Sequence, residues 1–193
     1  NPNINLLIEK PLGLNLKEAK KIISQKKKNQ KIFVGLNYRY FKGISCMLND
    51  IKKKKFGKIN SLLINFGHGH NPKILESWKL KKKYAGGGVI LDPGIHILNL
   101  IQLFCTDIKI KYIKKIKSFW KTGIEEEVII LLSSEEIPII NISLSILRWR
   151  STFQASRQTR TPTRRYGGVS FVFVFIFLLL TRPSNFFALL RFS

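Results

Sequence analysis

The stretch Ile4-Asn5-Leu6-Leu7-Ile8-Glu9-Lys10-Pro11 determines how the fold starts. Residues 4–8 are mostly apolar and are predicted to form a short β-strand. Proline favours extended geometry in the residue before it, so we expect the Lys10 side chain to project from the carboxyl end of this strand. The strand therefore ends in a basic group that other segments can approach.

A helix and a second strand are predicted directly after this stretch. Asn15 is expected to cap the helix, and Glu18, three positions on, completes a capping-box pattern. Apolar residues continue at helical spacing to Ile23. Residues 32–36 are the next predicted strand. Strand, helix and strand in this order predict a βαβ unit with parallel pairing.

A second loop-to-helix junction holds Gly86-Gly87-Gly88 and then Asp92-Pro93-Gly94-Ile95-His96. Asp92 is expected to cap the helix, with Pro93 in its first turn. Asp92 and His96 are four positions apart, so on a helix they would share one face. A neutral imidazole can take the proton of a hydroxyl near pH 7, and an ammonium can stabilise the resulting oxygen charge. We therefore predict that Lys10, Asp92 and His96 come together in one active site.

Each of these residues also has a purely structural interpretation. Asp92 can be a helix cap only, His96 a core histidine and Lys10 an exposed surface lysine. The three glycines can cradle a phosphate, but the Lys-Ser/Thr pair of a P-loop is missing. Close packing of their loop against substrate or cofactor is the better explanation.

The remaining pattern predicts an α/β (α+β) fold. An amphipathic helix is expected around residues 44–51, and a mostly buried helix follows Asp92. The predicted strands after the βαβ unit, which should form a mainly antiparallel open sheet, cover residues 59–66, 108–116, 128–132 and 137–147.

In order and spacing, these residues resemble the glucose–fructose oxidoreductase / inositol dehydrogenase (Gfo/Idh/MocA) family. The triplet Glu9-Lys10-Pro11 alone is a weak signal, but its order with the triple glycine and the Asp-x-x-x-His pattern is specific. The resemblance covers the chain from near residue 4 to about residue 147. The stretches that carry it are residues 9–12, 34–40, 56–59 and 86–98.

The resemblance implies an N-terminal Rossmann domain and a C-terminal α/β domain with a large open sheet. It also implies hydride transfer between a nicotinamide cofactor, NAD or NADP, and a hydroxyl carbon of a sugar or polyol. Lys10 would lie at the nicotinamide and the substrate hydroxyl, and His96 would transfer the proton with Asp92 beside it. Glu9 and Pro11 would shape the nicotinamide pocket.

The sequence departs from the family pattern at the cofactor. No G-x-G-x-x-G follows a strand, so the turn that binds the pyrophosphate is missing from it. Arg39 follows a predicted strand end and is a further candidate for cofactor binding, with an ordinary surface loop as the alternative. We therefore expect a truncated oxidoreductase, inactive alone. Residues 1–36 would be the remnant of the dinucleotide-binding domain, and residues 37–147 an incomplete substrate domain.

The charge is unevenly distributed. The net charge is +23, but all 25 lysines lie between Lys10 and Lys121, whereas eight of the nine arginines and no acidic residue follow residue 147. We therefore expect residues 148–193 to be an irregular, non-family tail of frameshifted or foreign origin. Its Phe-rich segment is shorter than the roughly 20 residues that span a bilayer.

Two other functions compete with the oxidoreductase. A basic nucleic-acid-binding protein would explain the lysine clusters, but no recognition-helix or RNA-stacking motif accompanies them, so no specific nucleic acid is expected. Attachment to a membrane through the Phe-rich tail is the other alternative, and no membrane is expected for the leading interpretation.

The remaining expectations concern location, metal and assembly. Cys46 and Cys105 with no signal peptide indicate a reducing, cytoplasmic location. His68 and His70 alternate along one strand, but no third ligand at motif spacing accompanies them, so no metal site is expected. Intact family members would form homo-oligomers through the open sheet, which should leave an exposed apolar face here.

Overall fold

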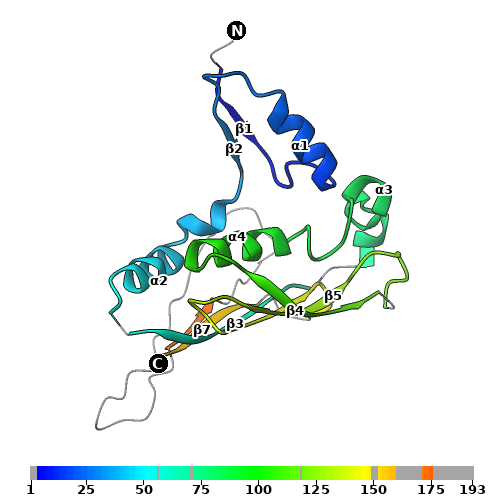
Figure 1. Cartoon of the computed structure of the whole chain (residues 1–193). Helices are drawn as coiled ribbons and strands as arrows, with labels where there is room; N and C mark the ends of the chain where they lie inside the picture. The colour runs from blue at the N-terminus through cyan, green and yellow to red at the C-terminus, as the bar shows by residue number, and fades with distance from the viewer. Residues whose placement is uncertain are drawn as a thin grey trace, which may run out of the picture.

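The computed structural model describes residues 4–55, 57–69, 72–117, 119–148, 152–159 and 171–175. Its first part is a βαβ unit that stands apart from a larger sheet (Figure 1). β1 (Leu6–Ile8) and β2 (Ile32–Val34) pair in parallel, and α1 (Leu16–Ser24) connects them. The predicted βαβ unit is therefore confirmed.

The start of α1 is fixed by the predicted capping box. The Asn15 side chain accepts a hydrogen bond from the Glu18 amide (3.0 Å) and donates one to the Glu18 carboxylate (3.0 Å). The other carboxylate oxygen of Glu18 accepts the Leu14 amide (2.9 Å). These bonds satisfy amide groups that the first turn of a helix leaves without an internal partner.

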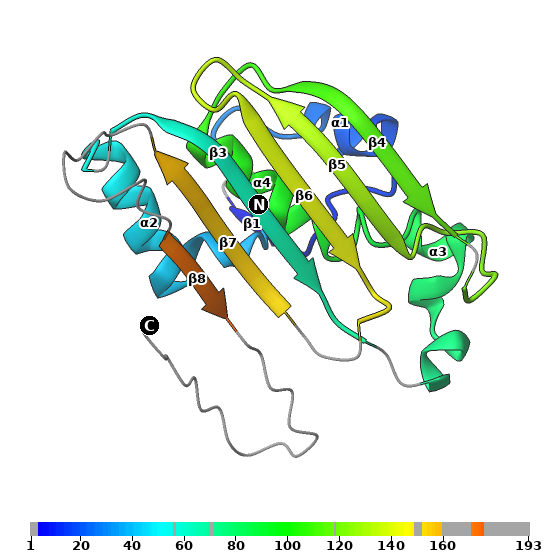
Figure 2. The ribbon, with the colours of Figure 1, turned by 90° about the horizontal axis from the view of Figure 1, so that it is seen from below.

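The second part begins with the 3-10 helix η1 (Asn37–Tyr40) and α2 (Lys42–Lys52). Among the described residues, six strands then form one sheet in the order β4-β5-β6-β3-β7-β8 (Figure 2). β3 lies parallel to β6 and antiparallel to β7. The strands are β3 (Ile59–Gly67), β4 (Lys109–Ile116), β5 (Glu127–Ser133), β6 (Ile139–Ser145), β7 (Thr152–Thr159) and β8 (Phe171–Phe175).

The strands β4, β5 and β6 form the predicted antiparallel meander. Between β3 and β4 the chain forms three short helices and then the predicted longer helix. These helices are η2 (Pro72–Glu76), η3 (Trp78–Leu80), α3 (Lys82–Ala85) and α4 (Gly94–Phe104).

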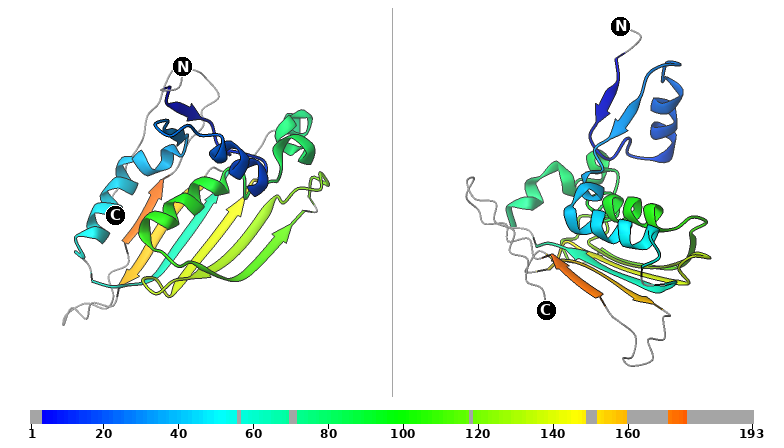
Figure 3. Two further views of the ribbon diagram at one scale, coloured as in Figure 1. Left: turned by 45° about the horizontal axis from the view of Figure 1, so that its top comes forward. Right: turned by 90° about the vertical axis from the view of Figure 1, so that its left-hand side faces the viewer.

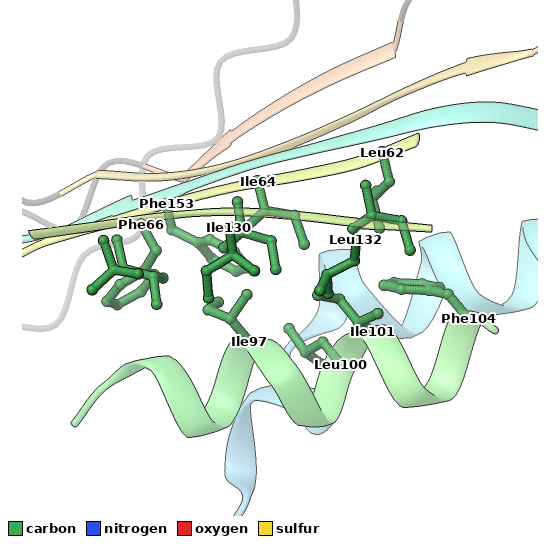
Figure 4. Close-up of a cluster of buried hydrophobic side chains, with 14 of the residues drawn as sticks. Leu62, Ile64, Phe66, Ile97, Leu100, Ile101, Phe104, Ile130, Leu132 and Phe153 are labelled. Atoms are coloured by element: carbon green, nitrogen blue, oxygen red, sulfur yellow. The ribbon is translucent and has the colours of Figure 1, made fainter. Parts of the chain in front are cut away.

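The core lies between one face of the sheet and the helices α2 and α4 (Figure 3). Figure 4 shows Ile97 and Ile101 of α4 directed at Leu62 and Ile64 of β3, and all four side chains are buried. Neighbouring strand residues point the other way, and Leu63 is among the exposed ones, with Ile129 and Ile139 on β5 and β6. The opposite face thus carries the exposed apolar side chains that the sequence predicts.

The structure corrects the prediction of an irregular segment after residue 147. Residues 152–159 form β7, which pairs along β3, and Phe153 is buried in the core. Five residues of the Phe-rich segment form β8 beside β7. β7 forms because β3 offers its backbone groups along a whole edge, which a polar sequence can pair with as well as an apolar one. The foreign origin of residues 148–193 stays a prediction, and the other residues after 159 lie outside the described ones.

No helix in the part of the chain that the structure describes is long and apolar enough to cross a membrane.

Candidate functional site

The structure brings Lys10 and Asp92 together although 81 residues separate them in the sequence. Lys10 follows the end of β1, and Asp92 stands two residues before α4. The Lys10 ammonium donates a hydrogen bond to the Oδ1 atom of Asp92. This ion pair joins the βαβ unit to the sheet part of the molecule.

Asp92 does not cap α4, so that prediction is wrong. The helix begins at Gly94, and Pro93 occupies the N-cap position without a side-chain hydrogen bond. Asp92 therefore lies outside the helix and does not share a helical face with His96. Its carboxylate is turned toward lysines instead, and these provide stronger, charge-assisted hydrogen bonds than the helix amides would.

His96 lies in the first turn of α4 and is only 5% exposed. Its ring stacks on Tyr38 of η1, with the ring centroids 4.1 Å apart and the planes 9° from parallel. Among the described residues the His96 Nδ1 atom finds no hydrogen-bond partner although it is buried. A buried polar atom without a partner is uncommon and costs free energy, which is typical of a group that meets a ligand.

The charge state of His96 follows from its surroundings. Burial lowers the pKa of the imidazole, and the positive charge of Lys10 lowers it further, to about 4. The carboxylates of Asp92 and Glu9 oppose this change only in part. His96 is therefore neutral at pH 7 and free to accept a proton.

A second lysine holds Asp92. The Lys79 Nζ atom of η3 lies 3.2 Å from the Asp92 Oδ2 atom, so each carboxylate oxygen faces one ammonium group. Partial burial acts to raise the pKa of Asp92, but the hydrogen bond and charge of Lys10, together with Lys79, hold that pKa below its ordinary value. Asp92 is thus ionised. Burial is the main reason that the pKa of the Tyr38 phenol is raised, and the negative charge of Asp92 raises it further.

These residues surround a cavity of about 190 Å³. Its polar lining includes Lys10, Lys79, Asp92, His68 and His96, and its apolar walls come from side chains such as those of Leu80, Val89 and Ile124. Trp78 also belongs to the lining. Because this indole is 59% exposed, it is available for stacking and does not anchor the core.

The glycine loop packs closely against the chain. Gly86 has a positive φ of 75°, and a Cβ there would lie 2.8 Å from the Leu14 carbonyl oxygen. A Cβ at Gly88 would overlap the carbonyl oxygen of Glu125, which already accepts the Val89 amide at 2.9 Å. Gly87 and Gly88 line the cavity. The loop therefore packs closely on backbone groups of this chain, and its expected packing against substrate or cofactor stays a prediction.

The predicted cofactor residues divide into two sets. Lys10 and Pro11 line the cavity, whereas Glu9 and Arg39 are not among the described residues that line it. The Glu9 carboxylate lies beside Gly35, the residue that follows β2. A Cβ atom added at Gly35 would lie 3.3 Å from the carboxylate oxygens of Glu9. Arg39 lies in η1, and its carbonyl accepts the Ser45 hydroxyl at 3.3 Å.

No metal-binding cluster of three His, Cys, Asp or Glu side chains occurs within the described residues. His68 lines the cavity, and burial is the main reason that the pKa of its imidazole is lowered. His70 lies outside the described residues.

Sequence reasoning missed Lys79 and Tyr38 as parts of this site. Lys79 is one of 25 lysines, and no motif distinguishes it from the others. Tyr38 belongs to residues 34–40, which carry the family resemblance, and it lies close to the end of a predicted strand. These two features together could have identified Tyr38 as a site residue.

Comparison with known proteins agrees with this fold. The family model described as the GFO/IDH/MocA C-terminal domain matches residues 49–164, which extends beyond the domain boundary predicted at residue 147. The trans-1,2-dihydrobenzene-1,2-diol dehydrogenase of Danio rerio is 25% identical over 133 residues, which are 68% of this chain and 39% of that protein.

Two solved structures illustrate the shared fold. The inositol dehydrogenase homolog of Azotobacter vinelandii, complexed with NAD+, superimposes with a TM-score of 0.70 at 20% identity, over 80% of this chain and 43% of that one. The WlbA dehydrogenase of Chromobacterium violaceum, complexed with NADH and UDP-GlcNAcA, gives a TM-score of 0.75 at 12% identity, over 88% and 49% of the two chains.

The fold shared with these structures is a mainly antiparallel sheet covered on one face by helices, with a βαβ unit beyond the helices (Figure 1). The chain belongs to the Gfo/Idh/MocA family. It spans about two fifths of the length of the curated relative from Danio rerio.

Proposed function

We propose that this chain forms the substrate-binding part of an oxidoreductase that transfers hydride between a nicotinamide cofactor and a hydroxyl carbon of a sugar or polyol. The observation that carries the proposal is the meeting of Lys10, Asp92 and His96 at one cavity, from segments far apart in the sequence. Membership of the Gfo/Idh/MocA family supports it.

Lys10 binds the reacting oxygen in this proposal. An ammonium group has three donors, and Asp92 takes one of them. The remaining donors can bind the substrate hydroxyl and stabilise the negative charge that develops on its oxygen. Asp92 fixes the position of the ammonium, and Lys79 fixes the position of Asp92.

His96 moves the proton in this proposal. Its imidazole is neutral at pH 7 and accepts the hydroxyl proton as the alcohol becomes a carbonyl. Burial and the charge of Lys10 lower the pKa of His96, and the charge of Asp92 offsets this only in part, so the imidazolium is an acid strong enough to give the proton back. In the reducing direction His96 returns the proton to the oxygen. The stacked Tyr38 ring keeps the imidazole in place.

The residues fit one end of a dinucleotide. Lys10 and Pro11 line the cavity together with Gly87 and Gly88 of the glycine loop. When bound, the nicotinamide supplies the acceptor or donor of the hydride. The glycine turn that would hold the pyrophosphate does not occur in the sequence given above. NAD is the preferred cofactor because the similar structures were solved with NAD+ and NADH.

We also propose the domain limits and the assembly. Residues 1–36 belong to the dinucleotide-binding domain, and the substrate domain begins at residue 37 and includes β7, which pairs along β3. The exposed side chains of Leu63, Ile129 and Ile139 make the open sheet face suitable for a homo-oligomer interface. A cytoplasmic location stays a prediction from the cysteines.

Saturation-transfer NMR with myo-inositol and glucose, in the presence of NADH, tests the proposed function. Lys10→Met should abolish or strongly weaken the saturation transfer from the protein to the polyol, because the polyol hydroxyl loses the charged group that donates a hydrogen bond to it. Lys17→Met, an exposed lysine on α1, is the matched control and should leave the signal unchanged. Equal transfer in the wild type and in Lys10→Met would refute the proposed site.

A further inference from the structure

The turn η3 places an exposed indole and an exposed ammonium side by side at the cavity. Trp78 is 59% exposed and Lys79 has a side chain that is 51% exposed, and both belong to the cavity lining. The turn is fixed by Ser77, whose side chain accepts the Lys79 amide at 3.3 Å. These two side chains therefore lie at the opening of the cavity, where an entering ligand meets them.

The described residues that line the cavity leave it with one net positive charge at pH 7. Burial lowers the pKa of both His68 and His96, so both imidazoles are neutral, and the raised pKa of Tyr38 keeps the phenol protonated. Lys10 and Lys79 then face a single carboxylate, that of Asp92. This excess positive charge favours an anionic ligand.

The charge of Lys79 is available to a ligand. Lys10 is mostly buried and already contacts Asp92, whereas Lys79 approaches the second carboxylate oxygen from the exposed side. An ammonium group has three donors, and Asp92 takes one from Lys79. The other two are free to meet an anionic group near the opening.

We propose that Trp78 and Lys79 select the substrate, and that the substrate of this site is a sugar acid, with its ring on the indole of Trp78 and its carboxylate on Lys79. The inference rests on the proposed function and narrows it. The apolar face of a sugar ring packs well on an indole. A carboxylate forms a charge-assisted hydrogen bond with an ammonium, about twice as strong as a neutral one.

The size of the cavity limits the ligand. Its volume is about 190 Å³. Pockets for drug-sized ligands measure roughly 300–1,000 Å³. The enclosed space therefore suits one monosaccharide unit, and its opening at Trp78 and Lys79 is where a charged substituent would lie.

Titration calorimetry of the full chain with D-glucuronate and D-glucose, each without and with NADH, tests the inference. Glucuronate should bind about tenfold more tightly than glucose, a factor that corresponds to 1.4 kcal/mol. Lys79→Met should remove most of this preference, and Lys79→Arg, which keeps the charge, should retain it. Lys81→Met is the matched control, because Lys81 is an exposed neighbour outside the cavity lining. Trp78→Ala should weaken both sugars severalfold.

The outcomes separate the two proposals. Equal affinity for the two sugars in the wild type overturns the sugar-acid inference and leaves the proposed function intact. An equal loss for both sugars in Lys79→Met also overturns it, because that result assigns Lys79 only to holding Asp92. If neither sugar binds under any condition, both the inference and the proposed function fail.

Discussion

The βαβ unit and the sheet domain are held together by different forces. None of residues 4–34 is buried, and the unit keeps its shape through parallel backbone pairing and the Asn15 capping box. The sheet domain instead has a continuous core of buried aliphatic side chains between its strands and α4. The site lies where these two parts meet, and each contributes a residue to it.

This contrast shows that the position of Lys10 depends on few contacts. His96 and Asp92 are supported by the packed domain, whereas Lys10 comes from the weakly packed unit and reaches them through its ion pair with Asp92. A change in the core should therefore affect the whole molecule, and a change in the unit should affect the site geometry and little else.

The largest expected effect is in the core. Leu144→Ala on β6 removes a side chain that is 0% exposed, so the free energy of unfolding should fall by about 2–5 kcal/mol. Leu7→Ala on β1 removes a side chain that is 80% exposed and should change it by less than about 0.5 kcal/mol. Urea denaturation followed by tryptophan fluorescence measures both. Similar losses in the two variants would contradict the contrast between the two parts.

The next effect concerns pH. An unfolded histidine binds a proton below about pH 6.5, but His96 in the folded protein binds one only below about pH 4. Stability should therefore be full above pH 6.5 and decrease as the pH falls toward 4, by roughly 3 kcal/mol in total.

Denaturation curves between pH 4 and 7 measure this dependence. His96→Phe, which keeps a ring against Tyr38, should remove most of the slope. His68 and Asp92, whose pKa values are also lowered, contribute to the remainder. A slope in His96→Phe as steep as in the wild type would show that the imidazole is not the group responsible.

A smaller effect is expected for the ion pair between the two parts. Asp92 is 41% exposed, so its coupling with Lys10 should contribute only about 1 kcal/mol. Lys10→Met, Asp92→Asn and the double variant form a thermodynamic cycle that isolates this contribution. Limited proteolysis with trypsin should show faster cleavage at the α1 lysines in each single variant, while the sheet domain stays protected. Unchanged cleavage would mean that other contacts hold the unit.

The smallest effect is local to α1. Asn15→Ala removes the side chain that accepts the Glu18 amide, which should cost about 1 kcal/mol of local helix stability. Hydrogen exchange in α1 should speed up about fivefold, while exchange in β6 stays unchanged. Faster exchange in both elements would show that the unit and the sheet unfold together.

Local sequence signals predicted the parts of the fold that depend on near neighbours. The Asn15 and Glu18 capping box, a mostly buried helix after Asp92 and the antiparallel pairing of β4, β5 and β6 are all present. The parallel pairing of β3 with β6 was not predicted, because no local pattern shows which distant strand will lie beside another.

The candidate site was predicted only as far as its motifs reach. Lys10, Asp92 and His96 were found because two short motifs in a familiar order contain them. The cap role of Asp92 was wrong, because a sequence pattern does not show that two lysines engage its carboxylate. Lys79 depends on a tertiary contact alone. The strand β7 was missed because its residues are mostly polar, and its place comes from the free edge of β3.

The central position of β3 also has a consequence for synthesis on the ribosome. Ser61 of β3 pairs with Ile139 of β6, and Phe66 pairs with Phe153 of β7, so both neighbours of this strand are translated long after it. At roughly 5–20 residues per second the nascent strand waits several seconds with both edges unpaired. The helix α4 emerges in this interval and can cover the apolar face of β3 before either partner strand arrives, so we expect early docking of α4 to shield that face from aggregation.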